Sequence, residues 1–267
     1  MSLIKFIESF TDDALLTNKG ASRRDSFMQF GTMGKNLALA AVPFGLAGLS
    51  NKAFAADIAP TPNTALGALQ LALTLEYLEA EFYNTALDTN GLIPASDQAI
   101  FAQIAAHEND HVTFLAGALG ANAPAIPMFD FTGGQGTNSG PFDAFGDYQV
   151  FLALAQAFED TGVRAYKGQA GNLLGSPFLT PALQIHSVEA RHAAEVRKLR
   201  GLKGWITGNL RGPGMPAETQ AVYDGEQNLD QAGYDASDEY GVDAGTEAFD
   251  EPINTMTSVT IANLFIV

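Results

Sequence analysis

The sequence contains no cysteine, and this absence excludes several classes of site at once. Disulfides, zinc sites built on thiolates, iron–sulfur clusters and cysteine nucleophiles all need a thiol. Basic residues are also scarce, with 14 Lys and Arg against 30 Asp and Glu and a formal net charge of −16. Because phosphate binding needs clustered Lys and Arg, this balance argues against nucleic acid as a partner. At 267 residues and 46% hydrophobic, the chain can form one large domain or two small ones.

Residues 1–56 have the features of an export segment rather than of the folded domain. Residues 22–28 contain two adjacent arginines and resemble a twin-arginine motif whose hydrophobic pair is displaced by one position. The apolar run 37–49 suits a signal sequence and is short for a membrane span, and residues 53–55 offer an Ala-x-Ala cleavage site. We therefore expect an exported protein of the periplasm or cell envelope, with an N-terminal amphipathic helix of a cytoplasmic protein as the alternative. An uncleaved segment would associate the protein with a membrane.

Apolar residues that recur every three or four positions predict four long helices within a domain at residues 60–200. We expect these helices at about 63–88, 96–117, 144–170 and 180–200. A Gly- and Pro-rich stretch at 121–142 separates the second helix from the third and cannot be helical. A loop of this length is unusual in a compact domain, and it fits a bundle with one long crossover from end to end. The predicted fold class is all-α.

The remaining residues, 201–267, are expected to form a C-terminal extension that packs on the bundle. Residues 201–250 are rich in Gly, Asp and Tyr without a clear period, which indicates ordered but irregular structure, with a disordered segment as the alternative. Residues 249–252 mark the start of a short final helix at about 252–265, whose apolar residues would dock on the bundle.

One spacing of a carboxylate and an imidazole occurs on two of the predicted helices. Glu108 and His111 form a Glu-x-x-His pair on the second helix, and Glu189 and His192 repeat it on the fourth. Because positions i and i+3 share a helix face, each pair can aim an oxygen and a nitrogen at one point. Two such pairs, with one further Glu from each of two other helices, are the ligand set of a carboxylate-bridged two-metal bundle.

The first and third helices supply the further Glu that this pattern needs. Glu76 lies 32 residues before the first pair, and Glu159 lies 30 residues before the second. A Glu on an apolar stripe is costly unless it is paired or bound to a metal. Each is followed seven positions later by a tyrosine, Tyr83 or Tyr166, which could bond a carboxylate on an antiparallel neighbour. The alternative role of the two tyrosines is that of plain core aromatics.

The chemistry of this residue set favours two bound cations. Four carboxylates so close together cannot all stay ionised in an apolar core, and two divalent cations would neutralise them. The mixed oxygen and nitrogen ligands suit iron or manganese better than calcium or structural zinc. Open coordination positions would let O₂ or peroxide bind.

The order E…ExxH…E…ExxH over residues 66–200 resembles that of the ferritin-like superfamily, as in bacterioferritins and rubrerythrins. More narrowly, residues 75–83, 157–166 and 248–252 resemble exported ferritin-like proteins related to plant desiccation-induced proteins. The narrower resemblance covers most of residues 60–267 and implies only a fold. The superfamily resemblance implies a ferritin-like four-helix bundle and two iron or manganese ions, with Tyr83 and Tyr166 beside the ligands. The ligands that it implies are Glu76, Glu108, His111, Glu159, Glu189 and His192.

Other acidic and histidine residues compete with this set or surround it. Glu79 lies one turn from Glu76 and is the main rival for its role. We expect His107 beside the ligands or as a hydrogen-bonded core histidine, and His186 in a structural role. Acidic residues of the extension are expected to form a solvated face, with weak calcium binding as a remote alternative; these are Asp235, Asp238 and Glu239.

The residue pattern and the resemblance favour one function and leave one alternative. We expect a two-metal carboxylate protein, holding two iron (or manganese) ions, that oxidises Fe(II) or consumes O₂ or peroxide. The alternative is a non-catalytic exported stress or structural protein with the same fold. Iron storage in a cage is disfavoured by the long extension and the export segment, and a rubrerythrin-type peroxidase by the missing cysteines. The expected partners are metal ions and O₂ or peroxide, and a homo-oligomer is compatible with the sequence.

Overall fold

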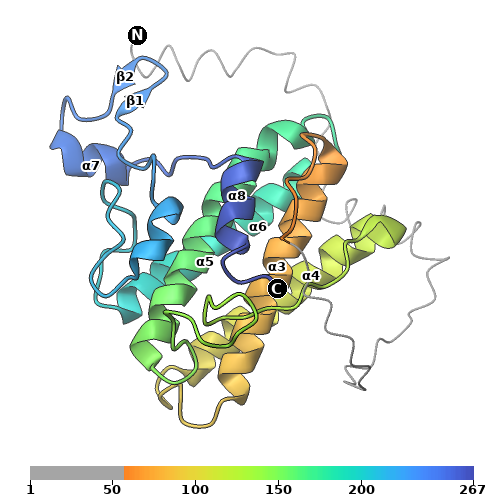
Figure 1. Ribbon diagram of the computed structural model, residues 1–267. Coiled ribbons are helices and arrows are strands. Elements are labelled where there is room, and N and C mark those ends of the chain that lie inside the picture. The colour runs from red at the N-terminus through yellow and green to blue at the C-terminus, as the bar shows by residue number, and fades with distance from the viewer. Residues whose placement is uncertain (1–56) are drawn as a thin grey trace. The chain divides into compact units, whose positions relative to one another are not determined.

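Four long helices make up the bundle in the computed structural model, which describes residues 57–267 (Figure 1). The predicted export segment at 1–56 lies outside the described residues. Helix α3 packs along α4, and α5 packs along α6, while α3 and α5 bring the two pairs together. The all-α bundle expected from the sequence is confirmed. The four helices are α3 (Ala65–Asp88), α4 (Gln98–Leu119), α5 (Tyr148–Gln169) and α6 (Leu179–Leu199).

Helix α5 is the central helix of the fold. It begins after Asp147, whose side chain accepts hydrogen bonds from the backbone N–H groups of Gln149 and Val150. Every residue from Phe151 to Tyr166 is buried, so the helix is covered on all sides. One side of α5 therefore faces the other bundle helices, and the opposite side needs a cover from elsewhere in the chain.

The long crossover between α4 and α5 is ordered around one buried carboxylate, Asp130. Its oxygens accept hydrogen bonds from the backbone N–H groups of Thr132 at 3.0 Å, Gly136 at 2.8 Å and Asn138 at 3.1 Å. Burial would raise the pKa of Asp130, but these hydrogen bonds outweigh it and lower the pKa. The backbone N–H of Asp130 also donates to Phe265, which ties the crossover to the C-terminus. The predicted crossover is thus present between α4 and α5, and its contact with the C-terminus holds it in place.

Aromatic side chains from distant parts of the chain form the core at one end of the bundle. The rings of Phe82 and Phe158 are 4.9 Å apart, centroid to centroid, and Phe158 is equally close to Phe265. Phe131 of the crossover lies 5.3 Å from Phe82. Full burial of such a side chain stabilises the fold by about 1.5–3 kcal/mol. The crossover and the C-terminus are therefore part of the core and do not merely connect helices.

The C-terminal extension supplies the cover of α5. Its elements are irregular and short, as expected: η4 (Ala217–Val222), β1 (Asp230–Gln231), β2 (Tyr234–Asp235), α7 (Gly241–Glu247) and α8 (Thr255–Ala262). The final helix is shorter than the predicted 252–265, because the Asn254 side chain caps the N–H of Thr257 and starts it later.

A buried ion pair joins this extension to α5. The Arg164 Nε lies 2.6 Å from Glu226 Oε1 and donates at 2.7 Å to the carbonyl of Glu251. The backbone of Ile253 passes so close to α5 that a side chain at Gly168 would collide with its carbonyl oxygen. Arg164 and Gly168 thus fix where the extension lies on the bundle.

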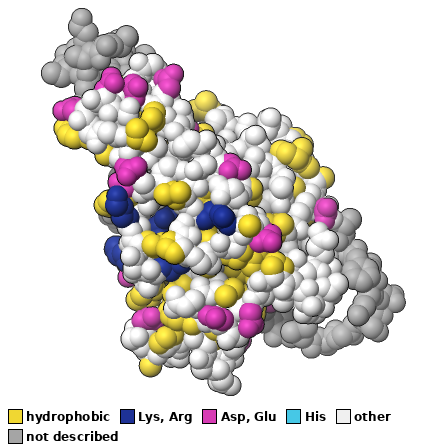
Figure 2. All heavy atoms as spheres, turned by 60° about the vertical axis from the view of Figure 1, so that its left-hand side comes forward, with side chains coloured by type: hydrophobic (Ala, Val, Ile, Leu, Met, Phe, Trp, Pro, Cys, Tyr) yellow, Lys and Arg dark blue, Asp and Glu magenta, His cyan; other side chains and the backbone are white. Residues whose placement is uncertain are grey.

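Charge is distributed unevenly over the described residues. All of their Lys and Arg side chains lie between Arg164 and Arg211, so residues 57–163 carry acidic side chains and no Lys or Arg. Figure 2 shows basic side chains gathered in one area of the surface, with acidic side chains around it. None of the described helices combines the length and the apolar composition that a transmembrane span requires.

Candidate metal centre

Six side chains from all four long helices meet inside the bundle. They form two overlapping groups, and within each group the candidate ligand atoms all lie within 4.8 Å of one another. Glu108 and Glu189 belong to both groups, which is the arrangement expected of carboxylates that bridge two ions. The first group is Glu76, Glu108, His111 and Glu189, and the second is Glu108, Glu159, Glu189 and His192. The structure therefore brings together all six residues of the predicted ligand set.

In the first group the carboxylates surround the imidazole of His111. Its Nδ1 lies 3.2 Å from Glu76 Oε2, 3.0 Å from Glu108 Oε2 and 3.1 Å from Glu189 Oε1. A ring nitrogen carries at most one proton, so it can donate to only one of these oxygens at a time. Three carboxylate oxygens therefore surround a single nitrogen that can supply only one hydrogen-bonding proton.

The second group repeats this arrangement around His192. Its Nδ1 lies 2.8 Å from Glu108 Oε1, 3.3 Å from Glu159 Oε2 and 3.2 Å from Glu189 Oε2. Glu108 and Glu189 therefore each place one oxygen near His111 and the other near His192. Glu76 lies near His111 only, and Glu159 lies near His192 only.

Three carboxylate oxygens at the centre are buried and have no hydrogen-bond partner among the described residues. They are Glu108 Oε1, Glu159 Oε2 and Glu189 Oε1. Each lies within 3.3 Å of an imidazole Nδ1, but the direction does not suit a hydrogen bond. Leaving such a group unsatisfied costs about 1–3 kcal/mol or more. Unpaired oxygens that converge with imidazole nitrogens fit divalent transition-metal ions, so this donor set could hold them.

Electrostatics point the same way. All four glutamates are fully buried. Burial raises the pKa of Glu159 to about 8, and burial together with the nearby Glu189 carboxylate raises the pKa of Glu76 well above its usual value. Burial would lower the pKa of His111, but the nearby carboxylates of Glu108, Glu189 and Glu76 raise it to about 12. The negative charge of the carboxylates thus favours protonated histidines, and a metal cation could replace the protons that these histidines carry.

Two tyrosines connect the halves of the centre. The hydroxyl of Tyr83 on α3 donates at 2.5 Å to Glu159 Oε1 on α5, and the hydroxyl of Tyr166 on α5 donates to Glu76 Oε1 on α3. Glu76 and Glu159 therefore each give one oxygen to a tyrosine and turn the other toward a histidine. Burial raises the pKa of both tyrosines well above the usual value, so both hydroxyls keep their proton.

A family comparison agrees with this geometry. The model of the ferritin-like domain matches residues 64–202, which contain the four long helices and all six clustered residues. The chain belongs to the ferritin-like domain family. No curated protein matches the chain significantly. The C-terminal extension beyond residue 202 lies outside the family match.

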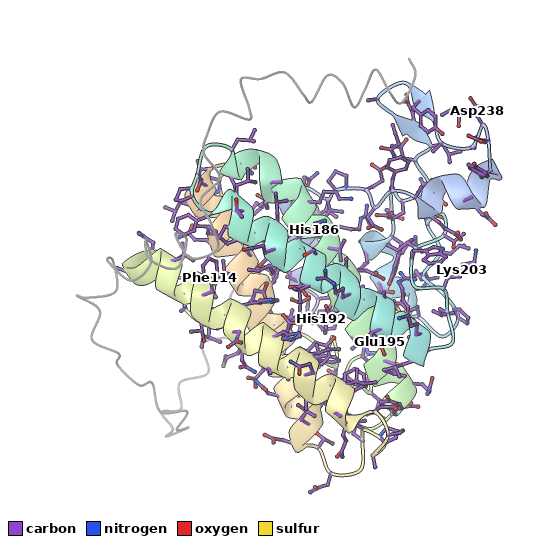
Figure 3. The ribbon with its side chains drawn as sticks, turned by 180° about the vertical axis from the view of Figure 1, so that it is seen from behind. Phe114, His186, His192, Glu195, Lys203 and Asp238 are labelled. Carbon is purple, nitrogen blue, oxygen red and sulfur yellow. The ribbon has the colours of Figure 1, made fainter. Side chains whose placement is uncertain are left out.

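In this ferritin-like domain His107 lies against the cluster of candidate ligands. Its Nδ1 lies 2.9 Å from His192 Nε2, and the two rings stack with their centroids 5.2 Å apart and an angle of 12°. Figure 3 shows His192 on α6, the helix that also carries His186. The His107 Nε2 lies 2.8 Å from the Nε2 of Gln103, one helical turn earlier on α4. Gln103 was not predicted from the sequence, although its spacing of four from His107 is a signal that could have identified it.

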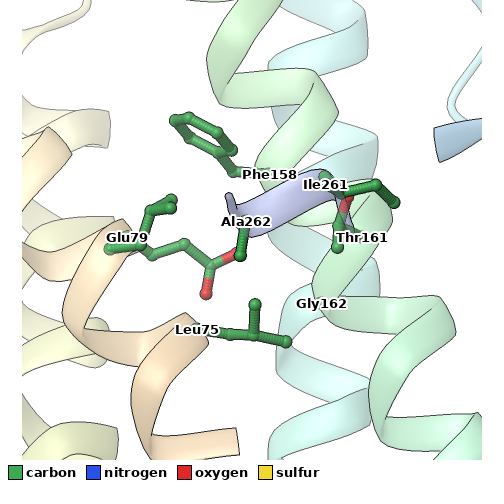
Figure 4. A pocket seen from close by; sticks show the side chains of 8 residues that line it. Leu75, Glu79, Phe158, Thr161, Gly162, Ile261 and Ala262 are labelled. Carbon is green, nitrogen blue, oxygen red and sulfur yellow. The ribbon is translucent and has the colours of Figure 1, made fainter. Parts of the chain in front are cut away.

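Glu79, the rival of Glu76, is buried but outside the two groups. Figure 4 shows its carboxylate pointing from α3 toward Gly162 of α5 and Ala262 of α8, where these residues line a small cavity. Burial, and then the charges of Glu189 and Glu159, raises its pKa well above the usual value. Burial therefore favours the protonated form of Glu79 beside the ferritin-like centre, and the sequence could not show this because α8 contributes to that burial.

The remaining candidates lie apart from the two groups. His186 is on α6, one turn before Glu189, and its Nδ1 has no hydrogen-bond partner among the described residues. Burial lowers its pKa, as expected for a structural histidine. In the extension, Asp235 accepts a hydrogen bond from the backbone N–H of Ser237 and is exposed.

Proposed function

We propose that this ferritin-like domain holds two iron or manganese ions and uses them to oxidise Fe(II) or to consume O₂ or peroxide. The observation that carries the proposal is the sharing of Glu108 and Glu189 between two groups of ligand atoms. In this proposal Glu76 and His111 would complete one position, Glu159 and His192 would complete the other, and Glu108 and Glu189 would serve both. When bound, such a pair of ions would supply electrons to O₂ or peroxide.

The protein's own residues prepare the site for this chemistry. Tyr83 and Tyr166 fix the rotation of Glu159 and Glu76, since each hydroxyl holds one oxygen and leaves the other directed at the site. The imidazoles of His111 and His192 must give up a proton from Nδ1 before they can bind a cation, so loading releases protons. Burial of the four glutamates keeps bulk water away from the ligand oxygens.

The test is metal analysis of the purified full-length protein, followed by stopped-flow measurement of Fe(II) oxidation. Two ions per chain and rapid O₂ consumption are expected. Glu108→Ala should lose both properties, because it removes a carboxylate shared by both positions. Glu81→Ala is the matched control, since Glu81 is exposed on α3 and outside the cluster. A folded wild-type protein that binds no iron or manganese would refute the proposal. Two bound ions without oxidation would identify the non-catalytic alternative instead.

We propose separately that residues 1–56 direct export to the periplasm or cell envelope. The support is the pair of arginines, the short apolar run and the Ala-x-Ala sequence. Replacing both Arg23 and Arg24 by Lys should leave the protein in the cytoplasm of a host that has a twin-arginine pathway. If that variant were still exported, export through the twin-arginine pathway would be contradicted.

A further inference from the structure

We propose that the two metal positions are unequal, that the position of His192 binds the tighter ion, and that His107 is the positioning residue that makes it so. This inference rests on the proposed function, because it concerns how the same cluster would bind its ions.

The two halves of the centre match closely in their donor atoms. Each half supplies a glutamate with one oxygen on a tyrosine, a Glu-x-x-His pair, and an imidazole whose Nδ1 faces three carboxylates. These contacts alone would give the two positions similar affinities. Any difference must come from residues behind the ligands.

The match ends at the residue that precedes each Glu-x-x-His pair. In α4 this residue is His107, and in α6 it is Val188. His107 reaches across to the histidine of the other half, where its Nδ1 meets His192 Nε2 at 2.9 Å. Val188 has no polar side-chain atom with which to do the same for His111.

The two ligand histidines are therefore supported differently. His192 is held at both ring nitrogens, by carboxylates at Nδ1 and by His107 at Nε2. His111 is held at Nδ1 only, and its Nε2 has no hydrogen bond to another residue of the stretch 57–267. The His111 side chain is also 12% exposed, against 6% for His192. The position of His111 is thus less constrained and closer to solvent.

The hydrogen bond from His107 fixes the tautomer that a ligand histidine needs. An ion at His192 Nδ1 requires the proton on Nε2, and that proton can be donated to His107 Nδ1. His107 then carries its own proton on Nε2 and donates it to Gln103, whose amide oxygen would face the ring after a turn of the amide. Gln103 is on the same helix and keeps His107 in its acceptor role.

Support of this kind changes metal affinity measurably. Removal of the group that accepts the second ring N–H of a ligand histidine typically weakens binding about 10- to 100-fold. The His111 position lacks that support in the natural sequence. We therefore expect its ion to bind about 10- to 100-fold more weakly than the ion at His192.

The test is a titration of the metal-free, full-length protein with Mn(II), with free Mn(II) measured by electron paramagnetic resonance. Wild type should show two ions bound with separate affinities. His107→Leu should still bind two ions, with the tighter affinity reduced to near that of the weaker one. His107→Asn should restore the difference between the two affinities, because the Asn side-chain oxygen can accept a hydrogen bond near the position of the His107 Nδ1. Val188→Ala is the matched control and should leave both affinities unchanged.

A second measurement separates positioning from loss of structure. With Co(II) as the probe, His107→Leu should change the visible absorption of only one of the two bound ions, and Gln103→Leu should do the same more weakly. Two equal affinities in wild type, or an equal loss at both positions in His107→Leu, would overturn the inference while leaving the two-metal centre intact. Failure of the wild type to bind any ion would instead overturn the proposed function.

Discussion

Tyr83 on α3 donates a hydrogen bond of 2.5 Å to Glu159 on α5, and this bond crosses between the two halves of the bundle. Tyr166 and Glu76 make the reverse connection. Each helix pair therefore orients a carboxylate that belongs to the other pair, so the halves cannot be assembled independently into a working centre.

Removing the Tyr83 hydroxyl should affect stability and metal binding together. Tyr83→Phe leaves the buried Glu159 Oε1 without a donor and should lower the free energy of unfolding by about 1–3 kcal/mol. Metal affinity should fall about 10- to 100-fold, because Glu159 loses its fixed orientation. Denaturant unfolding and Mn(II) titration measure the two effects. Tyr77→Phe is the control, because Tyr77 is on the same helix but only partly buried, and it should change neither quantity. If Tyr83→Phe also left stability and metal affinity unchanged, the aromatic ring of Tyr83 would matter and its hydroxyl would not.

Metal removal should destabilise the domain. Ions that bind only the folded state stabilise it by about 2.7 kcal/mol per site when their concentration is 100 times Kd. A chelator should therefore lower the melting temperature of the wild type. Glu189→Ala, which removes a shared carboxylate, should melt at the same temperature with and without chelator. A wild-type melting temperature that does not respond to chelator or added Mn(II) would contradict this prediction.

The metal-free protein should become less stable as pH rises from about 4.5 to 8. The pKa of Glu159 is raised to about 8, so over this interval the folded state holds more protons than the unfolded state. Stability falls with pH wherever the folded state binds more protons. His111 acts in the same direction above its usual pKa of 6.5, because its folded pKa is raised to about 12.

Urea unfolding of chelator-treated protein at pH 5 and pH 8 checks the sign of this effect. Glu159→Gln removes the group that titrates and keeps an acceptor for Tyr83, so its stability should decline less between the two values. In the metal-loaded protein the trend should reverse, because ions compete with protons and bind more tightly at higher pH. Equal stability of the metal-free protein at both pH values would count against the charge state derived for the cluster.

Breaking the ion pair between Arg164 and Glu226 should loosen the C-terminal extension. Arg164→Met leaves a buried, unpaired carboxylate and should cost about 3–5 kcal/mol. The double substitution Arg164→Met with Glu226→Leu should recover most of that loss, because two apolar side chains of similar size replace the pair. Hydrogen exchange at residues 222–226 reports the loosening, and equal protection in the single variant and the wild type would exclude the anchor role.

The helices and the cluster were predictable because both follow from local spacing. Glu108 and His111 are one turn apart, and the period of the apolar residues places each pair on the inner face of its helix. The fold class and the convergence of the six side chains needed no further information. The cross-bundle bond of Tyr83 was also within reach, since seven residues separate it from Glu76 on the same face.

Contacts between distant segments could not be derived in this way. Arg164 meets a carbonyl 87 residues further along the chain, and no period in the sequence encodes such a contact. The burial of Glu79 depends on α8, and the order of the crossover depends on the single carboxylate of Asp130. The predicted start of the final helix was also too early, because the capping side chain of Asn254 sets the start locally.

The complete burial of α5 has a consequence for how this protein can be divided. The family match ends at residue 202, but the outward side of α5 is covered by residues that follow it. A shortened chain of residues 64–202 would remove the partners of the Arg164 guanidinium and of the Gln156 side-chain nitrogen, because these partners come from residues 211–251. The segment that matches the family is therefore smaller than the segment that packs together as one domain, and the extension belongs to that domain as much as any bundle helix does.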